Sequence, residues 1–420
     1  MGKRVCTIFL MITLVGILTG CGNDTEGGSK KTLEVALWDE NISGAVDASI
    51  EEFNKEHPDV EVNVTYTPYA NYFTKLRTSI GGGSGPDVFW MNGPNFSEYA
   101  SYGLIKDLEP FIEEDSDFSK DAYFDSMIDL YSHEDHLYAA PYFSDIVGLF
   151  YNKRLFDEAG LEYPDETWTW EDIEEKGDIL ADQEEGVYGY TAYVVSNQAG
   201  YYNLIPQAGG YMIDEDKTHS GFNSPEAQEA LTFTQDLIDK GISPSVQTQI
   251  ENHPRDMFMS GMIAMHPEIS VNAEMFYSEL GDDLGVAPLP AGKEEGSIAH
   301  GIGWAMNGDT EQEELAWDLI KHLTGEKGNQ FIAESGFSIP AQESMSDLWV
   351  DSMPELDLQV FIDAQEVSFP YPVSQNTIQW QDIEQAEIQG AFLGYKSMKE
   401  ALDNVAREMD IILESEQINE

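Results

Sequence analysis

Early in the chain, strand-like and helix-like patterns alternate, and this alternation constrains the fold more than any other feature. Residues 32–37 and 60–66 alternate apolar and polar side chains with a period of two, which predicts β-strands. Residues 45–56 and 69–80 have helical spacing of apolar positions, and residues 87–91 form a third strand-like run. This order predicts an α/β fold with a mostly parallel sheet, in which ligand loops follow the carboxyl ends of the strands.

Further along, the patterns predict extended segments over residues 137–141 and 147–152, on either side of Tyr142–Asp145. Helices are expected to begin near Thr169 and Ser224. Ser224 is followed by proline, which is the residue preferred at the first position of a helix.

The chain is strongly acidic, with 78 Asp and Glu against 21 Lys and Arg and a formal charge of −57. Because phosphate binding needs a basic surface, nucleic-acid partners are excluded, and electrostatic adsorption to an anionic membrane is disfavoured. Hydrophobic residues make up 41% of the chain, enough for a substantial core, so a disordered or fibrous protein is excluded. A length of 420 residues predicts two or three domains.

The N-terminus carries the pattern of an exported protein. Two basic residues precede an apolar stretch at residues 5–18, which is shorter than the roughly 20 residues that a bilayer span needs. The following Leu-Thr-Gly-Cys resembles a bacterial lipobox, which implies that residues 1–20 are a signal peptide and that Cys21 is lipidated. Residues 21–31 then form a polar tether to the outer face of the cell membrane. An ordinary secretory peptide with an incidental cysteine is the alternative.

No cofactor and no metal site are expected. Cys6 would be removed with the signal peptide and Cys21 would carry lipid, so the mature chain offers no thiol ligand. The run His133-Glu134-Asp135-His136 lacks the spacing of a His-Glu-x-x-His zinc motif.

A series of short motifs resembles, in sequence order, the sugar-binding proteins of bacterial ABC importers, the family that includes maltose-binding protein. Each motif alone is weak, but their order extends over residues 32–412 behind the lipobox. The motifs are Trp38-Asp39, residues 53–58, Gly85-Pro86-Asp87-Val88, residues 137–141, 149–160, 261–265 and 287–292, and Ser338-Ile339-Pro340.

The resemblance implies a two-lobed periplasmic-binding-protein-like fold of type II, with a ligand cleft between lobes joined by hinge strands. The chain would cross between lobes near Pro141, Pro288 and Pro340. The implied lobes are residues 32–141 with 288–339, and residues 142–287 with 340–414. The protein would be a monomer that closes on its ligand and delivers it to the membrane subunits of an ABC permease.

A sugar presents hydroxyl groups and flat apolar ring faces, so its site needs polar side chains and aromatic platforms. Structural alternatives exist: Trp38 and Trp304 as core residues, Asp39 as a helix cap, Asn92 in a turn, and Asp145 bonded to hinge backbone. The candidates at the family's cleft positions are Trp38, Asp39, Glu40, Asn92, Tyr142, Ser144, Asp145, Gln198, Tyr201, Gly301, Gly303 and Trp304.

One segment departs from the family pattern. After residues 261–265 the family usually brings an aromatic residue to the cleft, whereas this chain has His266-Pro267-Glu268. His266 and Glu268 are therefore candidate ligand contacts, and Tyr371 is a candidate substitute for the missing platform.

These features predict a sugar or oligosaccharide receptor of an ABC importer, and not an enzyme. Two alternatives remain: a secreted carbohydrate-active hydrolase, and the sensor lobe of a signalling system. With 78 acidic residues, no pair of carboxyl groups stands out in the sequence as a glycosidase dyad.

Overall fold

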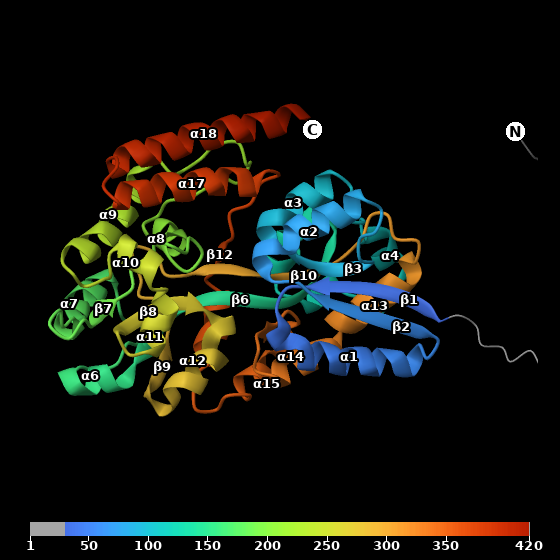
Figure 1. Ribbon diagram of the computed structural model, residues 1–420, viewed down its shortest axis with the longest axis horizontal. Helices are drawn as coiled ribbons and strands as arrows, with labels where there is room; N and C mark the ends of the chain where they lie inside the picture. The colour runs from blue at the N-terminus through green and yellow to red at the C-terminus, as the bar shows by residue number, and fades with distance from the viewer. Residues whose placement is uncertain (1–29, 420) are drawn as a thin grey trace, which may run out of the picture.

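The computed structural model describes residues 30–419. Two lobes lie side by side, and long strands run from one lobe to the other (Figure 1). The expected signal peptide, most of the tether and Cys21 lie outside the described residues. Lys31, the last residue of the expected tether, begins the first strand.

One lobe is built on the predicted alternation of strands and helices. Strands β1 (Lys31–Leu37), β2 (Val60–Tyr66) and β3 (Val88–Asn92) are parallel, in the order β2-β1-β3. Leu33, Val35 and Leu37 are buried in β1, as the period of two requires. The helices of this lobe are α1 (Ser43–Glu56), α2 (Tyr69–Gly81), α3 (Gly93–Ser101), α4 (Glu109–Glu114), α5 (Asp125–Leu130), α13 (Glu313–Thr324) and α14 (Glu326–Glu334).

Strand β6 (Ala139–Asn152) runs between the lobes (Figure 1) and is buried along its whole length. Its first half pairs antiparallel with β10 (Ile298–Met306), and its second half pairs with β8 (Ile263–Ile269) and β9 (Leu284–Ala287). Residues 139–141 of the first predicted extended segment and all of the second, 147–152, are thus parts of one strand, whereas Leu137 belongs to β5 (His136–Leu137). Two short strands, β11 (Ile339–Pro340) and β12 (Phe369–Pro370), pair with β6 and β10 beside the crossing.

The other lobe is richer in helices. β7 (Tyr188–Tyr190) extends the sheet beyond β8, so that ten strands form one sheet with the backbone order β2-β1-β3-β10-β6-β8-β7. Outside this sheet, β4 (Ser132–His133) and β5 (His136–Leu137) pair with each other as a separate hairpin of the first lobe. The remaining helices are α6 (Lys153–Ala159), α7 (Trp170–Leu180), α8 (Tyr201–Gln207), α9 (Pro225–Asp239), α10 (Val246–Glu251), α11 (Pro254–Met259), α12 (Ala273–Leu280), α15 (Ser346–Val350), α16 (Gln359–Gln365), α17 (Thr377–Phe392) and α18 (Met398–Asn419).

The two helix starts that the sequence predicts are capped as expected. Thr169 forms a capping box with Asp172 at the start of α7. The Ser224 side chain accepts a hydrogen bond from the backbone N–H of Ala227 at the start of α9.

The two glycines of β10 allow this strand to pack closely against its neighbours where the strands cross between the lobes. A Cβ atom on Gly301 would lie 2.3 Å from the Phe143 carbonyl oxygen and 2.5 Å from Met127 Cε. On Gly303 it would lie 3.1 Å from the Ala139 Cβ atom. Packing of β10 against β6 and its neighbours therefore accounts for both glycines without a ligand.

Candidate functional site

Polar and aromatic side chains from both lobes meet at the crossing strands. We call this group the interlobe cluster. The lobe built on β1, β2 and β3, which we call lobe one, contributes Asn92. The crossing strands contribute Asp145 and His300. The other lobe, which we call lobe two, contributes side chains from α8, α17 and the segment before α17. Its members are Asn92, Asp145, Tyr201, Tyr202, His300, Tyr371, Gln381 and Glu384.

Asn92 ends β3 and caps the N-terminus of α3. Its side-chain oxygen accepts from the Asn95 backbone N–H, and its Nδ2 donates to the Tyr69 hydroxyl at 3.0 Å. The Gly93 backbone N–H, one residue further, donates to His300 Nε2 at 3.3 Å. A nitrogen that accepts cannot carry the proton of a neutral imidazole, so in neutral His300 the proton is on Nδ1.

The protonated face of His300 points toward a buried carboxylate. His300 Nδ1 lies 3.7 Å from Asp145 Oδ2, and Asp145 is only 5% exposed. The Tyr371 ring lies 4.7 Å from the His300 ring, between centroids. Within residues 30–419, Asp145 Oδ1 is buried and has no hydrogen-bond partner, and the same holds for Gln198 Nε2 on the loop before α8. Buried polar atoms are nearly always paired in folded proteins, so the unpaired Asp145 Oδ1 leaves an acceptor in the cluster for a hydrogen-bond donor.

Glu384 is the centre of the lobe-two part of the cluster and is completely buried. The Tyr201 hydroxyl donates to one of its oxygens, and the Tyr202 hydroxyl donates to the other at 2.6 Å. Gln381 Nε2 donates to the hydroxyls of Tyr202, at 3.3 Å, and Tyr371, at 3.1 Å. Burial raises the pKa of Glu384 to about 7, although the tyrosine hydrogen bonds oppose the rise.

Several predicted site residues have structural roles around the cluster. Asp39 caps a short helical turn by accepting from the Asn41 backbone N–H, and Glu40, within that turn, is exposed. Trp38 is half-buried, with its ring 4.8 Å from that of Trp90. Ser144 bonds to the His300 carbonyl and to Gln365, which holds the crossing strands in register.

Tyr142 and Trp304 are buried in an aromatic group with Trp90 in the core of lobe one. Their positions match the interpretation of Trp304 as a core residue. In the described part of the chain, neither the Tyr142 hydroxyl nor the Trp304 indole N–H has a hydrogen-bond partner.

The structure does not bring His266 and Glu268 to the interlobe cluster. The His266 ring is buried against Tyr193 and Phe258. Glu268 forms an ion pair with Arg255 of α11 at 3.0 Å. Burial opposes the charge of Glu268, but His266 and Arg255 outweigh it and lower the pKa of Glu268 to about 2. A paired, buried carboxylate of this kind is explained by packing in lobe two.

The sequence candidates omitted five residues of the site. Tyr69 is 52% exposed, and its hydroxyl is bonded to Asn92. Tyr202, His300, Gln381 and Glu384 belong to the cluster itself. Gln381, Glu384 and Ile388 occupy helical spacing on the buried side of α17, and two polar residues on a core-facing stripe were the available signal.

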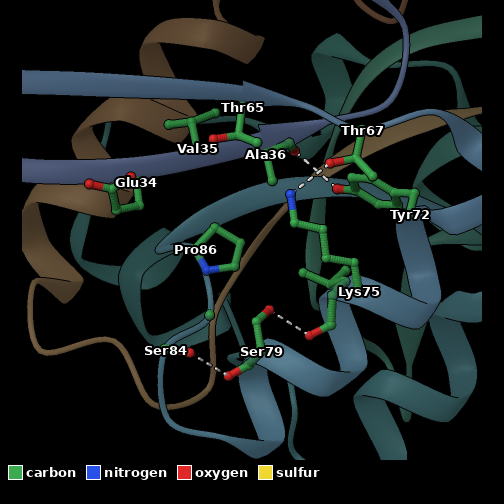
Figure 2. Close-up of a pocket in the computed structure, with 12 residues that line it drawn as sticks. Glu34, Val35, Ala36, Thr65, Thr67, Tyr72, Lys75, Ser79, Ser84 and Pro86 are labelled. Carbon is green, nitrogen blue, oxygen red and sulfur yellow. Dashed lines mark hydrogen bonds between the residues drawn. The ribbon is translucent and has the colours of Figure 1, made fainter.

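Two of the grooves in the described residues bear on the site. A groove of 840 Å³ has Tyr371 of the cluster in its wall and is otherwise lined mainly by α5 of lobe one and by residues 206–217 and 362–373 of lobe two. A smaller groove of 270 Å³ lies between α2 and the β1–β2 strands, where Lys75 donates to Thr67 (Figure 2). Because only lobe one lines the smaller groove, a ligand there would not link the two lobes.

Comparison with known proteins identifies the family. The profile of the family described as bacterial extracellular solute-binding protein matches residues 39–330 of this chain. The chain belongs to this family. Membership places the protein outside the cytoplasm, and it groups the chain with binding proteins and not with enzymes.

Individual members of the solute-binding family are similar over most of their length. The galactooligosaccharide-binding protein of Bacillus subtilis is 28% identical, over 83% of this chain and 82% of its own. The arabinooligosaccharide-binding protein of the same organism is 25% identical, over 78% of this chain and 77% of its own.

Solved structures confirm the predicted two-lobed α/β fold. An ABC substrate-binding protein from Listeria monocytogenes, in complex with cycloalternan, has a TM-score of 0.85 and 27% identity, covering 91% of this chain and 99% of its own. Maltose-bound MalE3 of T. maritima has a TM-score of 0.78 and 22% identity, covering 91% and 99%.

Two further observations concern the described part of this solute-binding protein. Over residues 30–419, no helix has the length and apolar composition to cross a membrane. In the same residues, no group of three or more His, Cys, Asp or Glu side chains is placed to hold a metal ion.

Proposed function

We propose that this protein captures a sugar or oligosaccharide outside the cell and delivers it to the membrane subunits of an ABC importer. Relatives that bind galacto- and arabinooligosaccharides support this ligand class. The Listeria protein, in complex with cycloalternan, supports it independently.

The unpartnered atom Asp145 Oδ1 of the interlobe cluster carries the proposal for the site, because it can only accept a hydrogen bond and a sugar hydroxyl can donate one. Gln198 Nε2, a donor that is unpaired within residues 30–419, is proposed to bind a second hydroxyl. Asn92 and Tyr201 add polar groups on the two sides, while Trp38, Tyr69 and Tyr371 offer ring faces for the apolar faces of a sugar.

Binding would be coupled to closure of the lobes. Asn92 belongs to lobe one and Glu384 to lobe two, and Tyr371 and His300 lie between them in the structure. A ligand that contacts both sides stabilises the closed arrangement by its higher affinity for that state. The importer would then recognise the closed form, and no catalytic step or cofactor is needed.

A thermal-shift screen against neutral oligosaccharides tests the ligand class, because a ligand that binds only the native state raises its melting temperature. The panel is galactobiose, arabinobiose and maltotriose, with calorimetry on each hit. We expect at least one of them to raise the melting temperature. Failure of these and of a broader neutral sugar library would refute the proposal.

We also propose that Cys21 is lipidated after removal of residues 1–20 and holds a monomeric receptor at the outer face of the membrane. Two acyl chains anchor a protein stably where a single chain is marginal. Expression in a bacterial host with labelled fatty acid tests this. The label should enter the wild type and be absent from Cys21→Ser, and label retained in the variant would contradict the assignment.

A further inference from the structure

The interlobe cluster contains two buried carboxyl groups, Asp145 and Glu384, and the groove that Tyr371 lines is acidic. Its lining has one cationic side chain, Lys217, and six acidic ones, Asp125, Asp129, Asp214, Glu215, Glu343 and Glu366. In the hydrogen bonds and ion pairs that the cluster members form within residues 30–419, no partner is a lysine or an arginine. Burial together with the two carboxyl groups of the cluster raises the pKa of Tyr371.

The helix N-terminus in the site is already occupied. The start of α3 faces the cluster, and a helix start is where an anion ordinarily binds. The Gly93 N–H donates to His300, and the Asn95 N–H donates to the Asn92 side chain. Pro94 between them has no N–H, so this end of the helix has no donor left for an anionic group.

The hydrogen-bonding groups of the site also disfavour an anionic ligand. Among residues 30–419, Asp145 Oδ1 is a buried acceptor without a donor. A sugar hydroxyl can donate to it, whereas an ionised carboxylate or a dianionic phosphate at the same place can only accept. An ionised ligand group would also lose its hydration and meet like charge in a poorly solvated site.

We propose that the interlobe site selects uncharged carbohydrates and rejects those that carry a carboxylate or phosphate, such as uronic-acid oligosaccharides and sugar phosphates. This inference rests on the proposed sugar-binding function and specifies its ligand class. It assigns the discrimination to Asp145 and Glu384 and not to the acidity of the whole surface.

The test compares matched ligands at pH 8. Neutral disaccharides and trisaccharides are screened beside the uronates obtained by oxidising their primary hydroxyls, and dissociation constants are measured by calorimetry. We expect each uronate to bind at least about tenfold more weakly than its neutral parent, from charge repulsion at short range. Glu384→Gln should reduce this ratio, and the exposed Glu274→Gln should leave it unchanged.

A change of pH gives a second test of the inference in the wild-type protein. Lowering the pH from 8 to 5.5 should reduce the ratio more in the wild type than in Glu384→Gln, since Glu384 gains a proton while a uronate stays ionised; the comparison is needed because His300 also faces Asp145 in the cluster. Uronates that bind as tightly as their parents, or that alone bind, would overturn the inference and leave sugar binding intact. A ratio reduced equally by Glu274→Gln would also overturn it. If neither set binds, the proposed function itself fails.

Discussion

Asp145 and Glu384 are both buried carboxyl groups of the interlobe cluster, but their hydrogen-bonding situations differ. Glu384 has a tyrosine hydroxyl on each oxygen, whereas Asp145 Oδ1 has no partner. Asp145 can therefore bond a ligand directly, while Glu384 orients Tyr201 and Tyr202. Sequence reasoning selected Asp145 from its place beside a hinge and missed Glu384, because one acidic residue among 78 has no distinguishing pattern.

Replacing Asp145 should weaken sugar binding. Removal of one partner from a buried hydrogen bond costs about 1–3 kcal/mol, which corresponds to roughly 5- to 150-fold in the dissociation constant. Asp145→Ala is compared by calorimetry with Asp347→Ala, an exposed aspartate of α15. Wild-type affinity in Asp145→Ala would show that this carboxylate does not contact the ligand.

Glu384 should make the stability of the ligand-free protein depend on pH. Its pKa rises from 4.5 to about 7 on folding, so the folded state holds the proton more tightly. The contribution is fully present below about pH 4.5 and is lost as the pH rises through 7, by on the order of 3 kcal/mol. Melting temperatures between pH 5 and 8 should decline less in Glu384→Gln than in the wild type. Equal slopes would argue against the raised pKa.

Asp39 should behave as a cap. Because its side chain accepts from the Asn41 N–H, Asp39→Ala is expected to lower stability by about 1 kcal/mol, seen as a reduced melting temperature. Sugar affinity, measured on the same variant, decides whether Asp39 acts as a helix cap or contacts the ligand. A loss of affinity with no loss of stability would favour the ligand contact.

At the scale of elements, strands and helices with local signals were predictable. The period of two in β1 and β2 and the caps of α7 and α9 follow from nearby residues. β6 was not predictable as one strand, because its partners change along its length from β10 to β8 and β9. A strand buried on both faces shows no alternation that could reveal its continuity.

The close packing of β10 on β6 can be tested at Gly301. Gly301→Ala would place a methyl group 2.3 Å from the Phe143 carbonyl oxygen, so the strands must separate and the melting temperature should fall by several degrees. Gly390→Ala is the matched control, since its nearest neighbour is Lys396 Cε at 3.7 Å. In a helix interior that change should be neutral or stabilising. An unaffected Gly301→Ala would show that the strands tolerate a side chain there.

For the whole molecule, the proposed mechanism predicts a change of shape on binding. Lobes joined by crossing strands can approach or separate by small backbone changes at the hinge, so a bound ligand shifts the population toward the closed state. Small-angle scattering should show a smaller radius of gyration when a saturating sugar is added. If calorimetry detects sugar binding but the radius of gyration stays unchanged, the ligand binds without closing the lobes, which contradicts the proposed mechanism.

The sequence by itself determined the α/β alternation and the helix caps, because each depends on residues near one another in the chain. The tertiary structure decided which side chains share the interlobe cluster. Asn92, Asp145, His300, Tyr371 and Glu384 are far apart in sequence, and only the pairing of β6 with β10 and the placement of α3 and α17 bring them together. The same folding buried the His266 ring in lobe two and paired Glu268 with Arg255 there, contacts that local sequence could not assign.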